Sequence, residues 1–179
     1  GVQIGCTNTI KWTTAQAITD WLPSGSTASA LPSGNMVNPT NSQYDNVLAA
    51  QLLAAKLNVG FDAYDPNFSP VDAVLGNRYY ADGPFTGMTV NTVIAWADEA
   101  IGGCDMHGHS FTEYNDALTN LNENYDNGTV DLGHLACTGS TSRFYTVSGE
   151  SIISAVFPNP ATNEANVTFN GKIGQTATI

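Results

Sequence analysis

Basic residues are scarce in this sequence. Its 179 residues include 5 Lys and Arg against 16 Asp and Glu, a formal net charge of -11. Lys and Arg neutralise phosphates and supply most of the affinity for nucleic acids, so nucleic acid and anionic membranes are poor partners for this chain. The acidity has two interpretations: it favours solubility, and it supplies carboxylates that can bind divalent cations.

Long apolar runs are also missing. No segment approaches the roughly 18 residues that suggest a membrane-spanning helix, so we expect no membrane insertion. Hydrophobic residues still make up 42% of the chain, enough for a core. The first residue is Gly and no signal peptide is visible, as we expect of an internal or processed fragment.

Cysteine occurs three times, at Cys6, Cys104 and Cys137. An odd number permits one internal disulfide and leaves one thiol over. We expect Cys104 to pair with Cys137, because the two flank one predicted helix and its exit loop. Cys6 would then find its partner upstream, in a longer precursor.

Motifs of nucleophilic catalysis are absent. The chain has no Gly-x-Ser-x-Gly elbow, and its acidic residues are too plentiful for their spacing to single out a glycosidase pair. Cys104, His107 and His109 have a spacing that could suit zinc or copper, but the expected disulfide would consume the thiolate. The sequence therefore predicts no enzyme.

Residues 1–44 are rich in Thr, Ser, Asn, Pro and Gly and mostly predict loop. One short helix is expected at about residues 14–22, where Ile18, Trp21 and Leu22 share a face. The remaining apolar residues indicate that this stretch lies on the surface of the helical region after it.

Three longer helices are expected in that region. At residues 44–59 leucines and valines recur at helical spacing between alanines, and Gly60 is the expected C-cap. Residues 90–101 follow Thr89, a suitable N-cap. Residues 112–125 follow Ser110, which has Glu at the capping-box spacing, and end before Asn127-Gly128.

Beyond Cys137 helical periodicity disappears, and short runs of β-forming residues alternate with Gly, Pro and Asn. We therefore expect an α+β chain. A mainly helical domain with three or four helices spans residues 1–137, a linker or first strand spans 138–151, and the beginning of a β-structure spans 152–179.

The segment SAVFPNPATNEANVTF, residues 154–169, resembles the opening of the type A C-terminal sorting domain of proteins exported through the type IX secretion system. The resemblance rests on Pro158, Asn159 and Pro160, on Val156 and Phe157 before them, and on the Val167-x-Phe169 strand after them. A turn between two strands would also explain the prolines.

This resemblance implies an Ig-like β-sandwich, export across the outer membrane, an extracellular or cell-surface location and the type IX machinery as a partner. In the family the domain continues through further strands, whereas this chain ends at Ile179. We expect the native protein to be longer, or another chain or domain to complete the sheet.

The segments LAAQLLAAKLNVGFD, FTGMTVNTVIAWADEAIGG and ALTNLNENYDNGTVD follow one another in an order similar to an uncharacterised helical domain of large secreted bacterial surface proteins. The resemblance covers roughly residues 5–137. It implies a fold and a location, and no chemistry.

Two acidic loops gather side-chain oxygens of the kind that Ca²⁺ prefers. They contain Asp62, Asp65, Asn67 and Asp72, and Asn122, Asn124, Asp126 and Asp131. Turn and helix-end chemistry explains the same residues, and the second loop departs from the EF-hand spacing. Calcium is the one candidate cofactor.

Aromatic residues offer a candidate recognition site. Tyr79 and Tyr80 follow Arg78 in a predicted loop, where we expect exposure. Trp21 and Trp96 lie on predicted helices and are expected in the core.

The sequence thus predicts a non-catalytic structural or adhesive module of a secreted surface protein or extracellular appendage. One alternative is a carbohydrate-binding accessory domain of a secreted hydrolase, which would recognise a surface polysaccharide through Arg78, Tyr79 and Tyr80. A second alternative is a filament subunit that binds copies of itself through an open β-edge.

Overall fold

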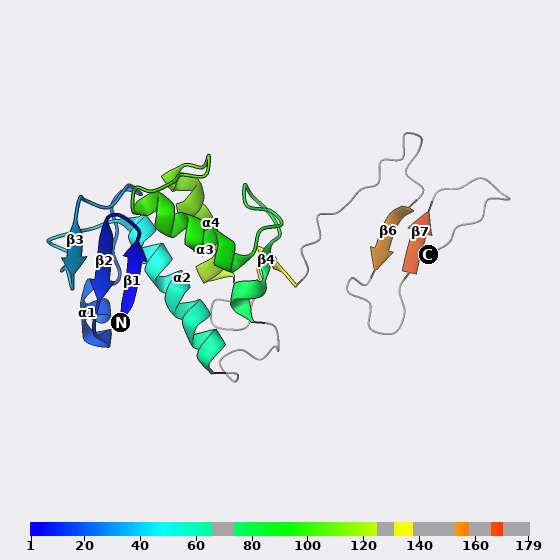
Figure 1. Ribbon diagram of the computed structural model, residues 1–179. Helices are drawn as coiled ribbons and strands as arrows, with labels where there is room; N and C mark the ends of the chain where they lie inside the picture. Colours follow the sequence, from blue (N-terminus) through cyan, green and yellow to red (C-terminus); the bar gives the residue numbers. More distant parts are fainter. Residues whose placement is uncertain (66–73, 125–130, 138–152, 158–165, 170–179) are drawn as a thin grey trace. The chain divides into compact units, whose positions relative to one another are not determined.

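The computed structural model describes residues 1–65, 74–124, 131–137, 153–157 and 166–169. The chain divides into two compact units, Gly1–Thr141 and Ser142–Ile179. The fold class is α+β, as predicted: the described residues form four α-helices and small sheets (Figure 1).

A small sheet that the sequence did not predict begins the first unit. Strands β1 (Val2–Gly5) and β2 (Thr9–Trp12) pair antiparallel, and β3 (Asn35–Val37) pairs parallel with β2. Ile4 lies opposite Ile10 in this register, and both are fully buried. Because successive side chains of a strand point to opposite faces, Ile4 and Ile10 lie on the same face of the sheet, the one toward the helices.

Helix α1 (Ala15–Trp21) lies between β2 and β3 and confirms the short helix expected there. It begins where the Thr14 side chain accepts a hydrogen bond from the Ala17 N–H. Its last residue, Trp21, is fully buried and packs 4.8 Å from Trp12, measured between ring centroids. This pair fixes α1 against the sheet.

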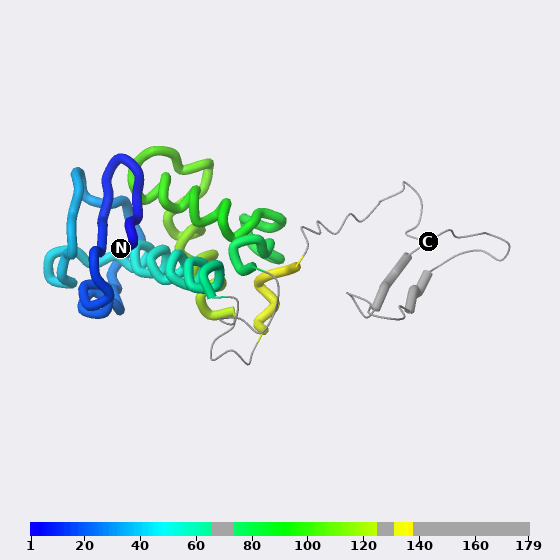
Figure 2. The backbone as a smooth tube through the Cα atoms, turned by 60° about the horizontal axis from the view of Figure 1, so that its bottom comes forward, coloured from blue at the N-terminus to red at the C-terminus, as the bar shows by residue number. Residues whose placement is uncertain are grey.

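Helix α2 (Val47–Tyr64) is the longest element, and β1 lies beside it in two views (Figures 1 and 2). It begins after the Asn46 cap rather than at Tyr44, and it continues through Gly60. The predicted C-cap at Gly60 is therefore wrong. The helical hydrogen bonds continue past this glycine, up to the bond that the Asp65 N–H donates to the Phe61 carbonyl.

Helices α3 (Val90–Ile101) and α4 (Phe111–Glu123) pack against α2. Both N-caps are confirmed: Thr89 accepts from the Thr92 N–H, and Ser110 forms a complete capping box with Glu113. The small alanines of α2 let α4 approach closely, so the core lies between these three helices and β1.

A short ribbon lies near the end of the first unit. The 3₁₀ turn η1 (Leu75–Asn77) leads into β4 (Tyr79–Tyr80), which pairs antiparallel with β5 (Leu135–Ala136). Tyr80 and Leu135 lie opposite each other and are both buried, so this ribbon belongs to the core of the first unit.

In the second unit, β6 (Ile153–Phe157) pairs antiparallel with β7 (Asn166–Phe169). A bulge interrupts the register between Ile153 and Ala155. The expected linker at 138–151 and the Pro158, Asn159 and Pro160 motif lie outside the described residues.

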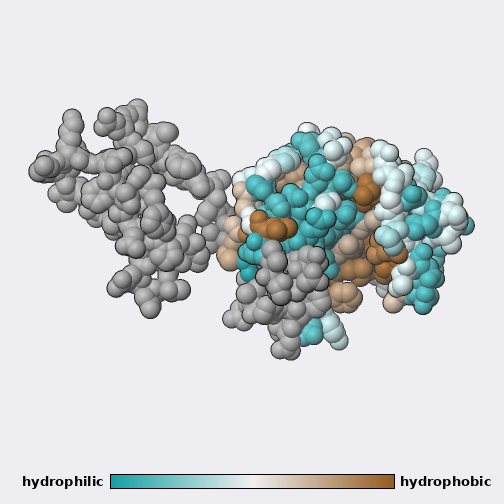
Figure 3. Space-filling model, turned by 180° about the vertical axis from the view of Figure 1, so that it is seen from behind, coloured by the Kyte–Doolittle hydropathy of each residue, from teal (hydrophilic) through white to brown (hydrophobic). Residues whose placement is uncertain are grey.

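Among the described residues, no helix combines the length and the apolar character that crossing a membrane requires. The face of the first unit shown in Figure 3 is mixed, with teal hydrophilic areas beside brown and tan hydrophobic ones.

Candidate functional site

A disulfide joins the N-terminal ribbon to the end of α3. Cys6 and Cys104 are bonded, with their Cα atoms 6.4 Å apart, and Cys137 is free and exposed. The predicted pairing of Cys104 with Cys137 is therefore wrong, and Cys6 has its partner within this chain.

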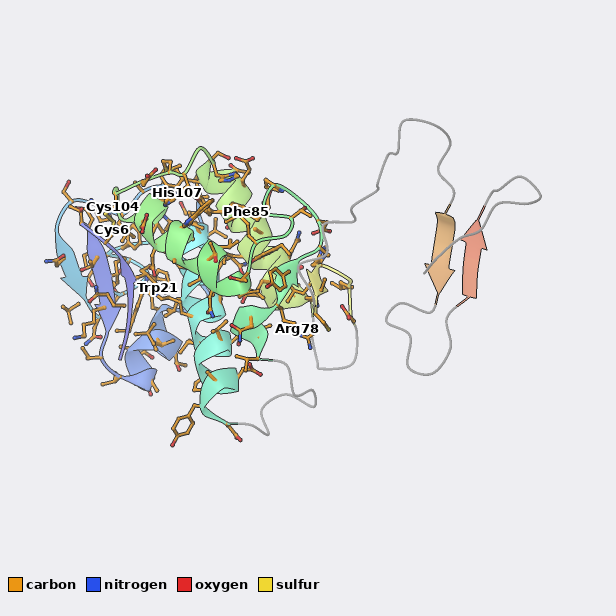
Figure 4. All side chains as sticks on the ribbon, turned by 45° about the vertical axis from the view of Figure 1, so that its right-hand side comes forward. Cys6, Trp21, Arg78, Phe85, Cys104 and His107 are labelled. Atoms are coloured by element: carbon orange, nitrogen blue, oxygen red, sulfur yellow. A yellow bond between two sulfur atoms is a disulfide. The ribbon has the colours of Figure 1, made fainter. Side chains whose placement is uncertain are left out.

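Backbone contacts explain this pairing. The Gly5 N–H donates to Asp98 Oδ1 at 2.9 Å, and the Asn8 N–H donates to the Gly102 carbonyl at 3.0 Å. A Cβ on Gly102 would lie 2.2 Å from the backbone nitrogen of Cys6, so only glycine permits this approach. Figure 4 shows Cys6 and Cys104 at one end of the unit and Arg78, the neighbour of Cys137, at the other.

An ion pair reinforces the same junction. Lys56 of α2 pairs with the Asp98 carboxylate of α3, and its Nζ also donates to the Gln3 carbonyl of β1 at 2.7 Å. Burial raises the pKa of Asp98, while the Lys56 ammonium and the Gly5 N–H oppose that rise. One carboxylate thus connects α2, α3 and β1.

Imidazole and aromatic rings pack against one another at the loop between α3 and α4, on the side where Figure 4 labels His107 and Phe85. Trp96 and His107 stack with centroids 4.3 Å apart and planes 7° apart. His109 lies 4.3 Å from Phe85 and 6.1 Å from Trp96, between ring centroids. Trp96 is only half-buried, so its predicted place in the core is confirmed only in part.

Each histidine has a carboxylate neighbour in the described part of the chain. Nitrogen–oxygen distances are 2.6 Å for His107 with Glu99, 3.9 Å for His109 with Glu113 and 3.0 Å for His134 with Asp82. The disulfide also makes Cys104 unavailable as a metal-binding thiolate.

The described members of the predicted calcium loops make structural contacts. Asp62 Oδ2 accepts from the Leu75 N–H at 2.6 Å, and Asp65 is the C-cap of α2. Asn67, Asp72 and Asp126 lie outside the described residues.

The second loop shows the same pattern. Asn122 Nδ2 donates to the Gln51 carbonyl and side chain, which ties α4 to α2. Asn124 is fully buried; it accepts from the His134 N–H at 2.8 Å and donates to Asp131 at 3.1 Å. Within the described ranges, no three His, Cys, Asp or Glu residues are grouped to hold a metal ion.

The predicted exposure of Arg78 and Tyr80 is wrong. Their relative exposures are 8% and 2%, and Tyr79 is half-buried. Strand β4 lies between β5 and residues 88–90, which leaves little of it open to solvent. Tyr80 Oη donates to the Ala117 carbonyl at 3.2 Å, and burial raises the pKa of this phenol.

The sequence did not predict the contact between Arg78 and Cys137. Arg78 Nη1 donates to Cys137 Sγ at 2.6 Å. The β4–β5 register places Tyr79 opposite Ala136, so the next pair along the ribbon brings residue 78 to residue 137. The odd cysteine count indicated a spare thiol, but no local pattern relates two residues 59 positions apart.

Comparisons with protein-family models, curated proteins and solved structures gave no match. Function is therefore inferred from the geometry of the described residues and from the sequence patterns.

Proposed function

We propose that this chain is a non-catalytic structural or adhesive module of a secreted cell-surface protein, exported through the type IX secretion system. The Cys6–Cys104 disulfide is the observation that carries the proposal. Disulfides persist in oxidising surroundings, whereas cytosolic thiols are kept reduced. A body closed by such a bond is suited to conditions outside the cell.

The connection between α3 and α4 supports a structural role. It is held by the disulfide at Cys104, by the Trp96–His107 stack and by the capping box at Ser110. These contacts use covalent, aromatic and hydrogen-bonding interactions within one short loop. Rigid loops of this kind suit a module that transmits or resists load.

The tail supports export. Strands β6 and β7 flank the segment that contains Pro158, Asn159 and Pro160, the motif that resembles a sorting domain. A two-stranded ribbon is at best marginally stable alone. We propose that it belongs to an Ig-like sandwich completed by further strands.

Cell-surface labelling of the native protein tests this proposal in a bacterium that has the type IX system. The double variant Pro158→Ala and Pro160→Ala should lose labelling by an impermeant biotin reagent, while total protein stays detectable. Pro66→Ala, a matched proline change outside the motif, should keep it. Equal labelling of the double variant and the unmodified protein would rule out the sorting role.

A second candidate function is self-assembly by strand addition. Strands β6 and β7 pair with each other and with no other described strand, so each has one edge unpaired within the described residues. Unpaired edges accept strands from other chains. Light scattering should show a larger particle for the full chain than for residues 1–150, and equal particles would exclude this route.

Carbohydrate binding through Arg78, Tyr79 and Tyr80 is not part of the proposal. Two of these three side chains are buried, so they cannot form an exposed stacking platform.

A further inference from the structure

A buried guanidinium meets an exposed thiol at the end of the β4–β5 ribbon. Arg78 is 8% exposed, and no carboxylate lies within 4.0 Å of it among the described residues. Arginine stays charged in proteins, and a buried charge is costly unless an anion or polar groups compensate it. The side-chain acceptor that the described residues offer this guanidinium is Cys137 Sγ, at 2.6 Å.

The contact is fixed from the Arg78 side. The Arg78 N–H donates to the Leu75 carbonyl at 3.0 Å, and its carbonyl accepts from the Val90 N–H at 2.9 Å. The adjacent Tyr80 and Leu135 are buried opposite each other, which holds β4 and β5 in register. The backbone that carries the guanidinium is therefore held in place.

Cys137 itself is accessible to solvent. Cys137 is exposed and free, whereas the other two cysteines are bonded to each other. A cation beside a thiol favours attack by its sulfur, because the attacking species carries negative charge. The buried Arg78 and the exposed, free Cys137 together form the candidate site.

We propose that Cys137 is a site of thiol–disulfide exchange, with Arg78 positioned to hold the charge of the attacking sulfur. The substrate class is a small-molecule disulfide. Cys137 gives its proton to solvent and attacks one sulfur of the disulfide; a new S–S bond forms as the old one breaks. The other sulfur leaves as a thiolate with the electron pair, so the substrate itself is the oxidant.

The rate of reaction with 4,4′-dithiodipyridine tests the proposal on the full chain. This disulfide is neutral, which limits the influence of the chain's net charge of -11. The unmodified protein should release one equivalent of thiopyridone and Cys137→Ser none. Arg78→Gln should react about tenfold more slowly, and Arg78→Lys should lie between the two.

Lys11→Gln is the matched control, because it removes the same charge from an exposed position of β2. It should react like the unmodified protein. Equal rates for Arg78→Gln and the unmodified protein would refute the role of Arg78. Mass spectrometry should place the adduct on Cys137 with the Cys6–Cys104 bond intact, and an adduct on either of those cysteines would refute the site.

A second measurement applies if Arg78→Gln does not fold. The unmodified chain is compared in its native state and unfolded in urea, with the glutathione thiol in each solvent as the reference. The native thiol should react faster than the unfolded one after this normalisation. A native rate equal to or below the unfolded rate would overturn the proposal.

Discussion

The environment of Asp98 predicts how the stability of the protein depends on pH. Burial raises its pKa above the ordinary value of 3.8, against the opposing effects of Lys56 and the Gly5 N–H. A carboxyl with a raised folded-state pKa holds its proton more tightly when folded. Its contribution to stability is present below the unfolded-state pKa and is lost as the pH rises through the folded-state pKa.

The variant Asp98→Asn isolates this effect. We expect the free energy of unfolding of the unmodified protein, relative to the variant, to fall as the pH rises from 3.8 through the raised pKa of Asp98. Urea unfolding of both proteins over a pH series measures this difference. A difference that grows with pH would show that attraction to Lys56 outweighs the burial of the carboxylate.

Trp21 illustrates the energetic weight of one buried side chain. It is fully buried, packs on Trp12, and its Nε1 donates to the Tyr44 carbonyl at 2.9 Å. We expect Trp21→Ala to lower the free energy of unfolding by about 3–5 kcal/mol, because it leaves a cavity and an unpaired carbonyl.

Tyr64→Ala is the control for this substitution. Tyr64 is 88% exposed at the end of α2, so its truncation should change stability by less than about 0.5 kcal/mol. Chemical denaturation of both variants measures the two losses in the free energy of unfolding. Similar losses for the two would mean that Trp21 contributes no more to the core than an exposed ring.

For single residues, the sequence predicted the burial of Trp21 correctly, but the predicted exposure of Arg78 and Tyr80 is wrong. A tryptophan on the apolar face of a short helix has few alternatives to the core. The burial of Arg78 and Tyr80 depends on residues 88–90 and on β5, which are distant from one another in sequence. No local pattern contains that information.

The start of α4 is an element whose stability depends on one side chain. Ser110 accepts from the Glu113 N–H at 3.2 Å, and Glu113 Oε2 accepts from the Ser110 N–H at 2.7 Å. These hydrogen bonds also lower the pKa of Glu113. We expect Ser110→Ala to cost about 1 kcal/mol of stability, as the loss of an N-cap usually does.

Thr112→Ala is the matched change, because Thr112 is exposed in the same turn and makes no cap contact. Thermal unfolding should leave this control within about 0.5 kcal/mol of the unmodified protein. The Ser110 hydroxyl also donates to Glu113 Oε2 at 2.9 Å, and a carboxylate accepts this bond more strongly than a protonated carboxyl does. The penalty of Ser110→Ala should therefore shrink as the pH falls through the folded-state pKa of Glu113. A penalty independent of pH would contradict a working capping box.

Helices were more predictable than strands because their signals are local. The caps at Thr89 and Ser110 and the periodicity of α2 lie within a few residues of the elements they define. Strands β1 to β3 are only three or four residues long, and β3 reaches β2 across α1. Pairing over that distance leaves no spacing pattern to detect.

The disulfide constrains the first unit as a whole. It encloses a loop with a sequence separation of 98 residues, and closing so long a loop restricts the unfolded chain strongly. We expect the double variant Cys6→Ser and Cys104→Ser to lose about 2–5 kcal/mol. Urea unfolding measures the loss.

Cys137→Ser serves as the control for this double variant. It removes a thiol that closes no loop among the described residues, so its midpoint of unfolding should change far less. A double variant as stable as this control would show that the long loop is held closed by packing alone.

The pairing of the cysteines could not be predicted from the sequence for a related reason. Cys104 and Cys137 are closer along the chain, but β1 runs beside α3 and brings Cys6 to its end. The contacts that bring Cys6 to Cys104 arise only on folding, so no local sequence pattern contains them.

The covalent link between residues 6 and 104 also determines how this body behaves under tension. If the chain is pulled from its two ends, force entering at residue 6 passes through the two sulfurs to residue 104. The 98 peptide units between them, about 330 Å of extended polypeptide, bear none of that force. Only the residues of this body outside the loop can then be extended, as long as the surroundings stay oxidising.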